Sequence, residues 1–286
     1  MTLAEALKHG TEKIGRREAM LLLSHASGFS GSKILLHRDE SLTDCACAIY
    51  LKCLERRNQN EPLQYIIGKW DFMGLEFNVD KRALIPRPET ELLVEEVLKF
   101  IKSRRNNVNF SPLRVLDVCT GSGCIALAIV CLTDAKTVAS VTATDISRDA
   151  LALAEENANK LNIPPGRVNF IESDLVERLL NCGNDKFDIV ISNPPYILHN
   201  DMAGLSQDVR DFEPHLALDG GVDGLDIYRR LIPQSKKILR PGGGLFLEIG
   251  PVQVADLLSD AGFFDIAIKR DYAGLDRIVT GRVLNV

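Results

Sequence analysis

The sequence lacks any excess of positive charge and any long hydrophobic run. It has 34 Lys and Arg against 39 Asp and Glu, which gives a formal net charge of −5. Tight, non-specific binding to nucleic acid needs a basic face, so we expect no stable nucleic-acid complex. A membrane-spanning helix needs roughly 20 consecutive apolar residues, and no run in the chain approaches that length. We therefore expect no membrane partner.

Cysteine pairs with the spacing of a metal site are also absent. The seven cysteines include no Cys-x-x-Cys pair, and no nearby histidine completes a zinc site, so no metal is expected. An odd number of thiols fits reduced side chains in a cytosol better than a disulfide framework. Residues 1–10 hold Glu5 and lack the apolar stretch of a secretory signal. The expected location is therefore cytoplasmic.

The composition is that of a globular protein, and the length suggests about two domains. The chain has 286 residues, of which 45% are hydrophobic and 26% are charged. Residues 1–60 show helical periodicity with almost no strand signal, and a polar break follows. We expect a small all-helical N-terminal domain over 1–60. A β-hairpin linker is expected over 61–85, where residues 77–80 alternate and Gly68 and Gly74 punctuate the chain.

Strands and helices alternate over the rest of the chain. This predicts an α/β domain over 86–286: a doubly wound, largely parallel sheet of about seven strands, closed by an antiparallel pair, with helices on both faces. Arg230, in the expected helix over 225–239, is expected to lie on the protein surface. The expected strands cover 114–118, 141–144, 168–171, 187–192, 245–249, 265–270 and 277–283, and the expected helices cover 88–102, 124–132, 148–161, 225–239 and 252–261.

Two stretches between these elements are expected to be irregular. Residues 241–244, Pro-Gly-Gly-Gly, predict a turn before the strand over 245–249. Residues 197–223 would form a loop of the length of many active-site lids, which makes them a candidate substrate cover. His199 and His215 lie in that loop and receive no catalytic role.

A glycine-containing loop follows the first strand of the α/β domain. Gly121 and Gly123 would let a ligand approach the backbone at the N-terminus of the next helix. With Ala126 the pattern reads Gly-x-Gly-x-x-Ala, as in nicotinamide-binding proteins, and Asp145 lies where a ribose-binding carboxylate belongs. The loop by itself therefore fits more than one nucleoside cofactor.

Carboxylates at three successive strand ends favour S-adenosylmethionine over a dinucleotide. Asp117 would face the positively charged methionine portion, whereas it would repel a pyrophosphate. Asp145 would accept from both ribose hydroxyls. Asp174 would accept from the adenine amino group, with Leu175 against the ring. The predicted cofactor-binding residues are Asp117, Cys119, Thr120, Gly121, Ser122, Gly123, Asp145, Asp174, Leu175 and Asn193.

The motif Asn193-Pro194-Pro195-Tyr196 follows the strand over 187–192 and predicts the catalytic residues. An amide or aryl nitrogen is a poor nucleophile because its lone pair is delocalised. The side-chain oxygen of Asn193 and the carbonyl of Pro194 can hold its two N–H groups and aim the lone pair, while neither proline brings a competing N–H. Tyr196 can stack on a planar amide or base. This is catalysis by orientation and electrostatics, with no strong base required before attack.

With these residues in place, the chain resembles the HemK/PrmC family, the protein-(glutamine-N5) methyltransferases of peptide chain release factors. DNA adenine methyltransferases share the Asn-Pro-Pro-Tyr motif, but its combination with residues 84–91, Leu-Ile-Pro-Arg-Pro-Glu-Thr-Glu, is far more specific. The resemblance covers nearly the whole chain. Further matching segments are 62–68, 77–90, 116–128, 212–218, 220–225 and 271–277.

The resemblance implies a class I (Rossmann-like) methyltransferase domain that uses S-adenosyl-L-methionine, after a helical domain that helps to bind the release factor. The implied substrate is the glutamine of the Gly-Gly-Gln motif in class-1 release factors, methylated on N5. Two positions depart from the family. Cys119 replaces a common glycine, so its backbone is expected to avoid positive φ, and Leu175 stands where some members carry an aromatic residue.

Four other functions compete with this one. A nucleic-acid adenine N6-methyltransferase would use the same Asn-Pro-Pro-Tyr geometry but usually needs a basic cleft and a target-reading domain. A glutamine methyltransferase of a ribosomal protein is closer, although its residues after the Pro-Arg pair differ from the Pro-Glu-Thr-Glu at 88–91. A nicotinamide-dependent reductase offers no role for residues 193–196. A non-catalytic binding module would not need that motif intact.

Overall fold

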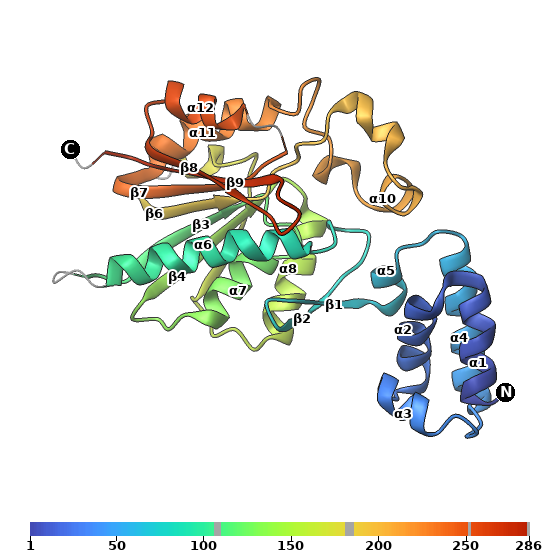
Figure 1. Ribbon diagram of the computed structural model, residues 1–286. Coiled ribbons are helices and arrows are strands. Elements are labelled where there is room, and N and C mark those ends of the chain that lie inside the picture. The colour runs from blue at the N-terminus through green and yellow to red at the C-terminus, as the bar shows by residue number, and fades with distance from the viewer. Residues whose placement is uncertain (106–109, 181–185, 251–252, 285–286) are drawn as a thin grey trace. The chain divides into compact units, whose positions relative to one another are not determined.

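The chain folds into two compact units in the computed structural model (Figure 1). The structure describes residues 1–105, 110–180, 186–250 and 253–284. One unit comprises Met1–Lys69 and Ser206–Phe212, and the other comprises Trp70–Leu205 and Glu213–Val286. Each unit has a hydrophobic core of its own. None of the described helices is long and apolar enough to cross a membrane.

The first unit is helical, as the periodicity predicts. Leu22, Leu23 and Leu54 are almost fully buried in its core. Tyr50 is buried among them, and its hydroxyl donates to the carbonyl oxygen of Ala6 at 3.1 Å. Buried apolar stripes on several short helices therefore stabilise this unit. Its helices are α1 (Leu3–Ile14), α2 (Arg16–Ser27), α3 (Gly31–Leu36), α4 (Asp44–Asn58), α5 (Leu63–Ile67) and α10 (Gln207–Phe212).

The first unit continues past the boundary predicted at residue 60. Leu63 and Ile66 of α5 pack into the same core as α1, α2 and α4. The side chain of Asn60 donates to that of Gln207 in α10 at 3.1 Å. The polar break that suggested a boundary is therefore a connection inside the unit, because apolar residues of the same core follow it.

A short hairpin lies within the predicted 61–85 linker. It pairs β1 (Lys69–Phe72) with β2 (Leu75–Asn78). Met73 and Gly74 join the strands with φ of 53° and 73°, and positive φ at both central residues is typical of the tight turns that fit hairpin twist. The rings of Phe72 and Phe77 pack edge to face in the core of the second unit, with centroids 6.1 Å apart.

A seven-stranded sheet forms the centre of the second unit and confirms the predicted α/β class. The strand order is β5-β4-β3-β6-β7-β9-β8. Strands β5, β4, β3, β6 and β7 run parallel, and β9 pairs antiparallel with both β7 and β8. The strands are β3 (Leu113–Val118), β4 (Val138–Asp145), β5 (Val168–Glu172), β6 (Phe187–Ser192), β7 (Leu239–Glu248), β8 (Phe264–Arg270) and β9 (Asp276–Arg282).

Helices cover both faces of the sheet, as Figure 1 shows. On one face α6 (Pro88–Arg105), α7 (Cys124–Leu132) and α8 (Arg148–Lys160) enclose one hydrophobic cluster. On the other face α11 (Asp226–Ile238) and α12 (Val254–Asp260) enclose a second, next to the short α9 (Glu177–Leu180). Burial on both faces explains why β6 is buried at every position, including the polar side chains of Asp188 and Ser192.

Both predictions of irregular structure are wrong. Residues 241–244 lie inside β7, which begins at Leu239, and the pairing with β6 shifts register between Phe187 and Ile189 to accommodate the additional residues. Residues 197–223 form short helices instead of one long loop. These are η1 (His199–Gly204), α10 and η2 (His215–Ala217).

Candidate active site

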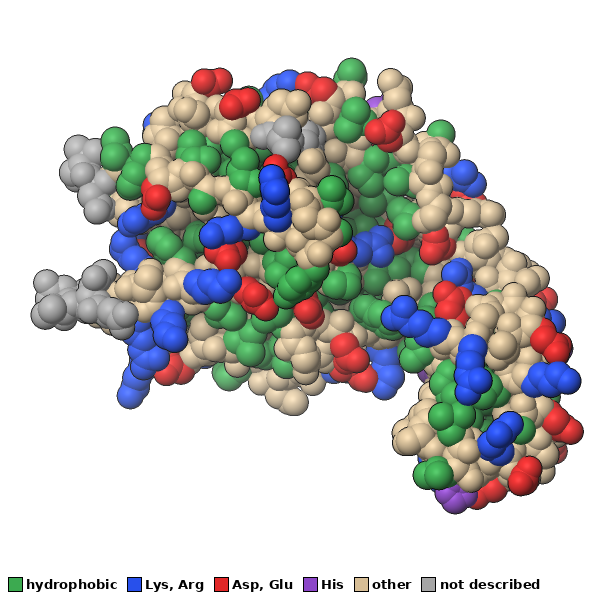
Figure 2. Space-filling model, in the orientation of Figure 1, with side chains coloured by type: hydrophobic (Ala, Val, Ile, Leu, Met, Phe, Trp, Pro, Cys, Tyr) green, Lys and Arg blue, Asp and Glu red, His purple; other side chains and the backbone are tan. Residues whose placement is uncertain are grey.

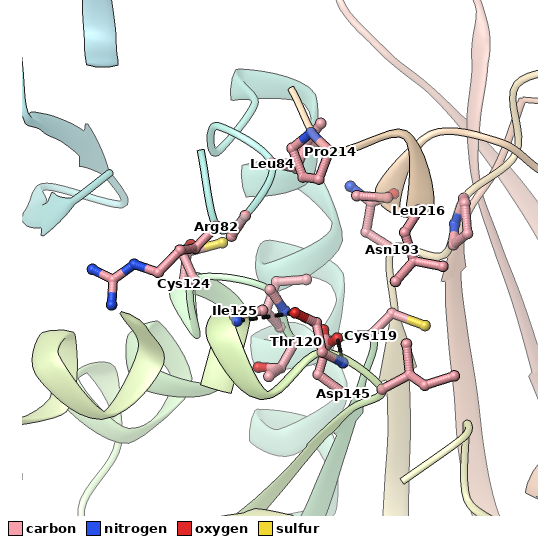
Figure 3. Close-up of a pocket in the computed structure, with 18 of the residues that line it drawn as sticks. Arg82, Leu84, Cys119, Thr120, Cys124, Ile125, Asp145, Asn193, Pro214 and Leu216 are labelled. Atoms are coloured by element: carbon pink, nitrogen blue, oxygen red, sulfur yellow. Dashed lines mark hydrogen bonds between the residues drawn. The ribbon is translucent and has the colours of Figure 1, made fainter. Parts of the chain in front are cut away.

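A pocket opens at the carboxyl ends of the central parallel strands (Figure 3). The strand order reverses between β3 and β6, and ligands of doubly wound sheets bind at such a switch point. Four strand ends line the pocket with residues 119–122, 145–147, 173–175, and Asn193 with Pro195. The topology therefore brings the glycine loop and the Asn-Pro-Pro-Tyr motif to one pocket.

The loop after β3 makes a left-handed turn at Cys119. Its φ is 60°, so the expectation that this backbone would avoid positive φ is wrong. Such a conformation costs a residue with a side chain roughly 1–2 kcal/mol. Hydrogen bonds hold the chain on either side and offset this cost: the amide of Thr120 donates to the carbonyl of Thr144 at 3.0 Å, and that of Gly123 donates to Thr120 at 2.9 Å.

Asp145 ties the end of β4 to this loop. Its two carboxylate oxygens accept from the backbone amides of Gly121 and Ser147, each at 2.9 Å. Burial raises the pKa of Asp145, whereas these backbone hydrogen bonds lower it. Figure 3 shows Asp145 beside Thr120 and Ile125. Each oxygen keeps a lone pair for a second donor from the pocket.

Asp117 and Gly123 are the predicted cofactor residues that do not line the pocket. Asp117 is fully buried beneath the loop, where one oxygen accepts from the Thr120 hydroxyl at 2.6 Å and from the amide of Ala126 at 3.2 Å. Its other oxygen, Oδ1, has no hydrogen-bond partner among the described residues. Burial raises the pKa of Asp117 to about 7. A cation bound above the loop would favour the ionised form of this carboxyl group.

Asp174 and Leu175 line the pocket at the end of β5. The guanidinium of Arg230 pairs with Asp174 at 2.7 Å and with Glu177 at 3.1 Å. Arg230 also lines the pocket, so its prediction as a helix-surface residue missed this contact. Leu175 is buried and has a φ of 49°.

The acceptor motif begins directly after β6. Of its four residues, Asn193 and Pro195 line the pocket, and Pro194 is buried without lining it. Figure 3 shows Asn193 near Leu216 and Pro214. The Nδ2 of Asn193 donates to the Oγ1 of Thr90 at 3.2 Å. Its Oδ1 makes no hydrogen bond within the described part of the chain.

Tyr196, the fourth residue of the motif, packs outside the pocket lining. Its ring lies so close to Gly250 that a Cβ there would be 2.6 Å from the ring. The hydroxyl donates to Oε1 of Glu248 at 3.3 Å and accepts from Arg277 at 3.4 Å. Burial and the Glu248 carboxylate raise the pKa of Tyr196 to about 12. Its stacking on an acceptor amide remains a prediction.

A buried carboxylate, that of Glu248, lies beside the pocket-lining Thr90, and the sequence motifs predicted a role for neither residue. Glu248 is 1% exposed at the end of β7, and its Oε2 accepts from the Thr90 hydroxyl at 2.7 Å. Burial raises its pKa to about 7. One signal could have revealed it: Glu248 is the only charged residue in the apolar run 245–249.

A second buried carboxylate joins two segments of the pocket wall. Glu213 accepts from the backbone amide of Ile85 at 3.2 Å and pairs with Arg87 at 2.5 Å. Its side chain is 1% exposed, so both partners are needed to compensate its burial. This pair fixes the segment before α6 next to Pro214, which also lines the pocket.

The histidines of residues 197–223 lie outside the pocket lining. His199 pairs with Asp219 at 2.7 Å on the surface. Within the ranges that the structure describes, no group of three His, Cys, Asp or Glu side chains could hold a metal ion.

Comparisons with known proteins identify the family. A family model described as the PrmC N-terminal domain matches residues 3–68, and one described as the methyltransferase small domain matches residues 90–210. The release factor glutamine methyltransferase of Clostridium acetobutylicum is 40% identical over 96% of this chain and 93% of its own length. That of Moorella thermoacetica is 40% identical over 97% of each chain.

The chain belongs to the release factor glutamine methyltransferase family. Among solved structures, the 16S rRNA N2 G1207 methyltransferase RsmC of T. thermophilus, solved with AdoMet and guanosine, is similar with a TM-score of 0.53 and 18% identity. The match covers 75% of this chain and 49% of that chain. At this identity it supports the methyltransferase fold alone. The family membership rests on the sequence relatives, which match along nearly the whole chain.

Proposed function

We propose that this chain transfers the methyl group of S-adenosyl-L-methionine to the side-chain amide nitrogen, N5, of the glutamine in the Gly-Gly-Gln motif of class-1 release factors. One observation carries the proposal: Asn193 and Pro195 line the same pocket as Asp145 and residues 119–122. An acceptor-orienting motif and a nucleoside-binding loop therefore meet. The names of the relatives supply the substrate class.

The residues of the pocket fit S-adenosylmethionine. Beneath the pocket lining, the Oδ1 of Asp117 is a buried carboxylate oxygen without a hydrogen-bond partner among the described residues, which suits a positively charged ligand above the loop. Asp145 would accept from the ribose hydroxyls, and Asp174 with Leu175 would hold the adenine. Residues 119–122 would provide backbone contacts to the methionine portion. When bound, this cofactor supplies an electrophilic methyl group.

The Asn193 side chain and the Pro194 carbonyl would hold the two N–H groups of the substrate amide. These two acceptors would turn the lone pair of the substrate nitrogen toward the methyl group, which is the orientation that attack requires. Attack would form the nitrogen–carbon bond as the methyl group leaves the sulfur of the cofactor, which departs as a neutral thioether, and the methylated amide nitrogen would lose one proton to water. The Oδ1 of Asn193 makes no hydrogen bond within the described residues, so it is free to orient the substrate amide.

We assign the helical unit to recognition of the release factor. Residues 3–68 match the PrmC N-terminal domain, which makes this unit a family feature. On the face shown in Figure 2, Lys and Arg side chains are interspersed with Asp and Glu side chains. That pattern, with a net charge of −5 for the whole chain, favours a protein substrate over a nucleic acid.

The test combines purified protein, isotopically labelled S-adenosylmethionine and a purified class-1 release factor. We expect one labelled methyl group on the peptide that contains Gly-Gly-Gln, located on the glutamine by fragmentation in a mass spectrometer. A release factor with that glutamine replaced by alanine is the matched control. Label on the control protein, or on duplex DNA offered instead, would refute the proposed substrate.

A further inference from the structure

A buried chain of hydrogen bonds connects Asn193 to the carboxylate of Glu248. The Nδ2 of Asn193 donates to the Oγ1 of Thr90 at 3.2 Å, and the hydroxyl of Thr90 donates to the Oε2 of Glu248 at 2.7 Å. Thr90 is 2% exposed and Glu248 is 1% exposed, so water does not replace either partner. The three residues come from the motif after β6, the first turn of α6 and the end of β7.

The chain of hydrogen bonds has only one direction when Glu248 is ionised. A carboxylate accepts hydrogen bonds and cannot donate them, whereas a threonine hydroxyl has a single proton. Thr90 gives that proton to Glu248, so its oxygen can only accept. Only the NH₂ group of Asn193 can therefore face Thr90, and Oδ1 is left for the pocket that Asn193 lines.

This direction matters because the two ends of an asparagine amide have nearly the same shape but opposite hydrogen-bonding character. A reversed amide would present N–H donors to the N–H groups of the substrate, and two donors do not bind each other. Packing alone discriminates weakly between these two orientations. A fixed acceptor behind the residue discriminates strongly, because a buried donor left without a partner costs roughly 1–3 kcal/mol.

We propose that Thr90 and Glu248 are positioning residues that fix the amide of Asn193, so that its Oδ1 accepts from the substrate amide. The inference rests on the proposed function, because only an acceptor with N–H groups needs an oxygen at that place. Neither residue touches the reacting atoms. Thr90 also lines the pocket, so it acts where Asn193 meets the substrate.

Several groups set the charge of Glu248. Its pKa is raised to about 7. Burial is the largest cause and the charge of Glu89 adds to it, while the hydrogen bonds of Thr90 and Tyr196 and the charge of Arg277 act in the opposite direction. Below that pH the carboxyl group of Glu248 becomes protonated and can donate a hydrogen bond to Thr90. The hydrogen bonds from Asn193 to Glu248 then no longer have a single possible direction. At saturating cofactor we expect kcat to rise as pH increases through about 7, and this rise should flatten in Glu248→Gln, whose side chain does not titrate.

The decisive variants are Thr90→Val and Thr90→Ser. Valine keeps the size and removes the oxygen, so kcat for release-factor methylation should fall about tenfold or more, as for a lost hydrogen bond to a charged group. Cofactor Kd, measured by calorimetry, should stay within about threefold of the parental value, because among the described residues this oxygen hydrogen-bonds to Asn193 and Glu248. Serine keeps the hydroxyl and should restore most of kcat. Thr142→Val is the matched control, because Thr142 is a buried threonine of β4 outside the pocket lining.

Three results would overturn the inference: Thr90→Val at the parental rate, no rescue by serine, or an equal loss in Thr142→Val. If Thr90→Val fails to fold, the dependence of kcat on pH in Glu248→Gln tests the proposal instead. A rise of kcat through pH 7 as steep as in the parent would contradict it. Failure of the proposed function is distinguishable, because then the parental enzyme itself would transfer no methyl group to the glutamine.

Discussion

Asp145 has two roles at the residue scale, one within the protein and one toward the cofactor. It accepts from the amides of Gly121 and Ser147, and its remaining lone pairs are the proposed acceptors for the ribose hydroxyls. Asp145→Ala removes two charge-assisted hydrogen bonds, each worth roughly 1.5–3 kcal/mol before compensation. We expect the affinity for S-adenosylmethionine, measured by calorimetry, to fall at least about tenfold.

Asp145→Asn provides the control for that prediction, because it keeps one acceptor oxygen and the size of the side chain. Its cofactor affinity should lie between those of the parent and of Asp145→Ala. Unchanged affinity in Asp145→Ala, or tight binding of a nicotinamide dinucleotide to the parent, would contradict the cofactor assignment.

Residue by residue, the sequence predicted those parts of the site that are contiguous along the chain. Asn193 and the loop at 119–122 could be found because each motif is a continuous segment. Thr90 and Glu248 could not, because they are 158 positions apart and their contact arises only when α6 packs beside β7. The backbone of Cys119 was mispredicted because side-chain type alone does not show the hydrogen bonds that hold a positive φ.

At the scale of elements, Gly123 sets how closely α7 and α8 pack. It precedes α7 with a φ of 79°, and a Cβ there would lie 3.0 Å from the Cβ of Ala154 in α8. Gly123→Ala should therefore lower the free energy of unfolding by about 2–4 kcal/mol, from backbone strain plus overpacking. Urea unfolding followed by circular dichroism measures this.

Gly166→Ala is the matched control for the packing term. Gly166 has a similar φ of 81°, but a Cβ there would meet nothing within 4 Å. The free energy of unfolding of Gly166→Ala should fall by about 1–2 kcal/mol, the cost of the strained backbone alone. If both variants lose the same stability, the close approach of α8 contributes nothing, and our account of this junction is wrong.

The elements that the sequence predicted best are mostly apolar segments that the folded protein buries along nearly their whole length. The expected helix over 124–132 coincides with α7, where burial is nearly continuous, and the strand over 187–192 coincides with β6. Residues 241–244 were mispredicted because a register shift lets Pro and Gly continue β7. α5 was missed because five residues give too little periodicity to detect.

At the scale of the whole molecule, burial of Asp117 makes stability depend on pH. Its pKa is about 7 in the folded protein against 3.8 in the unfolded chain. Between these values the folded state keeps a proton that the unfolded state has lost, so the contribution of this group to stability declines as pH rises from about 4 to about 7. Asp117→Asn lacks this titration.

We therefore expect the free energy of unfolding without cofactor to decline less from pH 5 to pH 7.5 in Asp117→Asn than in the parent. Over this pH range the difference should reach at most about 2.5 kcal/mol. Asp188→Asn is a control at a carboxylate of the same sheet that pairs with Arg240 at 3.0 Å. Equal slopes in the parent and Asp117→Asn would show that Asp117 is ionised throughout.

The sequence also predicted most of the whole-molecule organisation. The helical first unit and the parallel sheet with an antiparallel end follow from patterns that each segment carries by itself. The inclusion of residues 206–212 in the first unit does not, because that grouping joins segments nearly 140 residues apart. Contacts between distant segments depend on the folded topology, which no local pattern records.

The most direct test of the account is single-turnover methylation of a release factor by Asn193→Ala, with cofactor bound beforehand. If Oδ1 of Asn193 aims the lone pair of the glutamine amide, turnover should fall at least roughly 10²-fold, as for the loss of one preorganised polar partner, while cofactor affinity is largely kept. Asn193→Asp still accepts a hydrogen bond but adds negative charge, so its rate should lie between those of Ala and the parent. Methylation of the glutamine by Asn193→Ala at the parental rate would contradict the orienting role and leave the motif as a rigid turn.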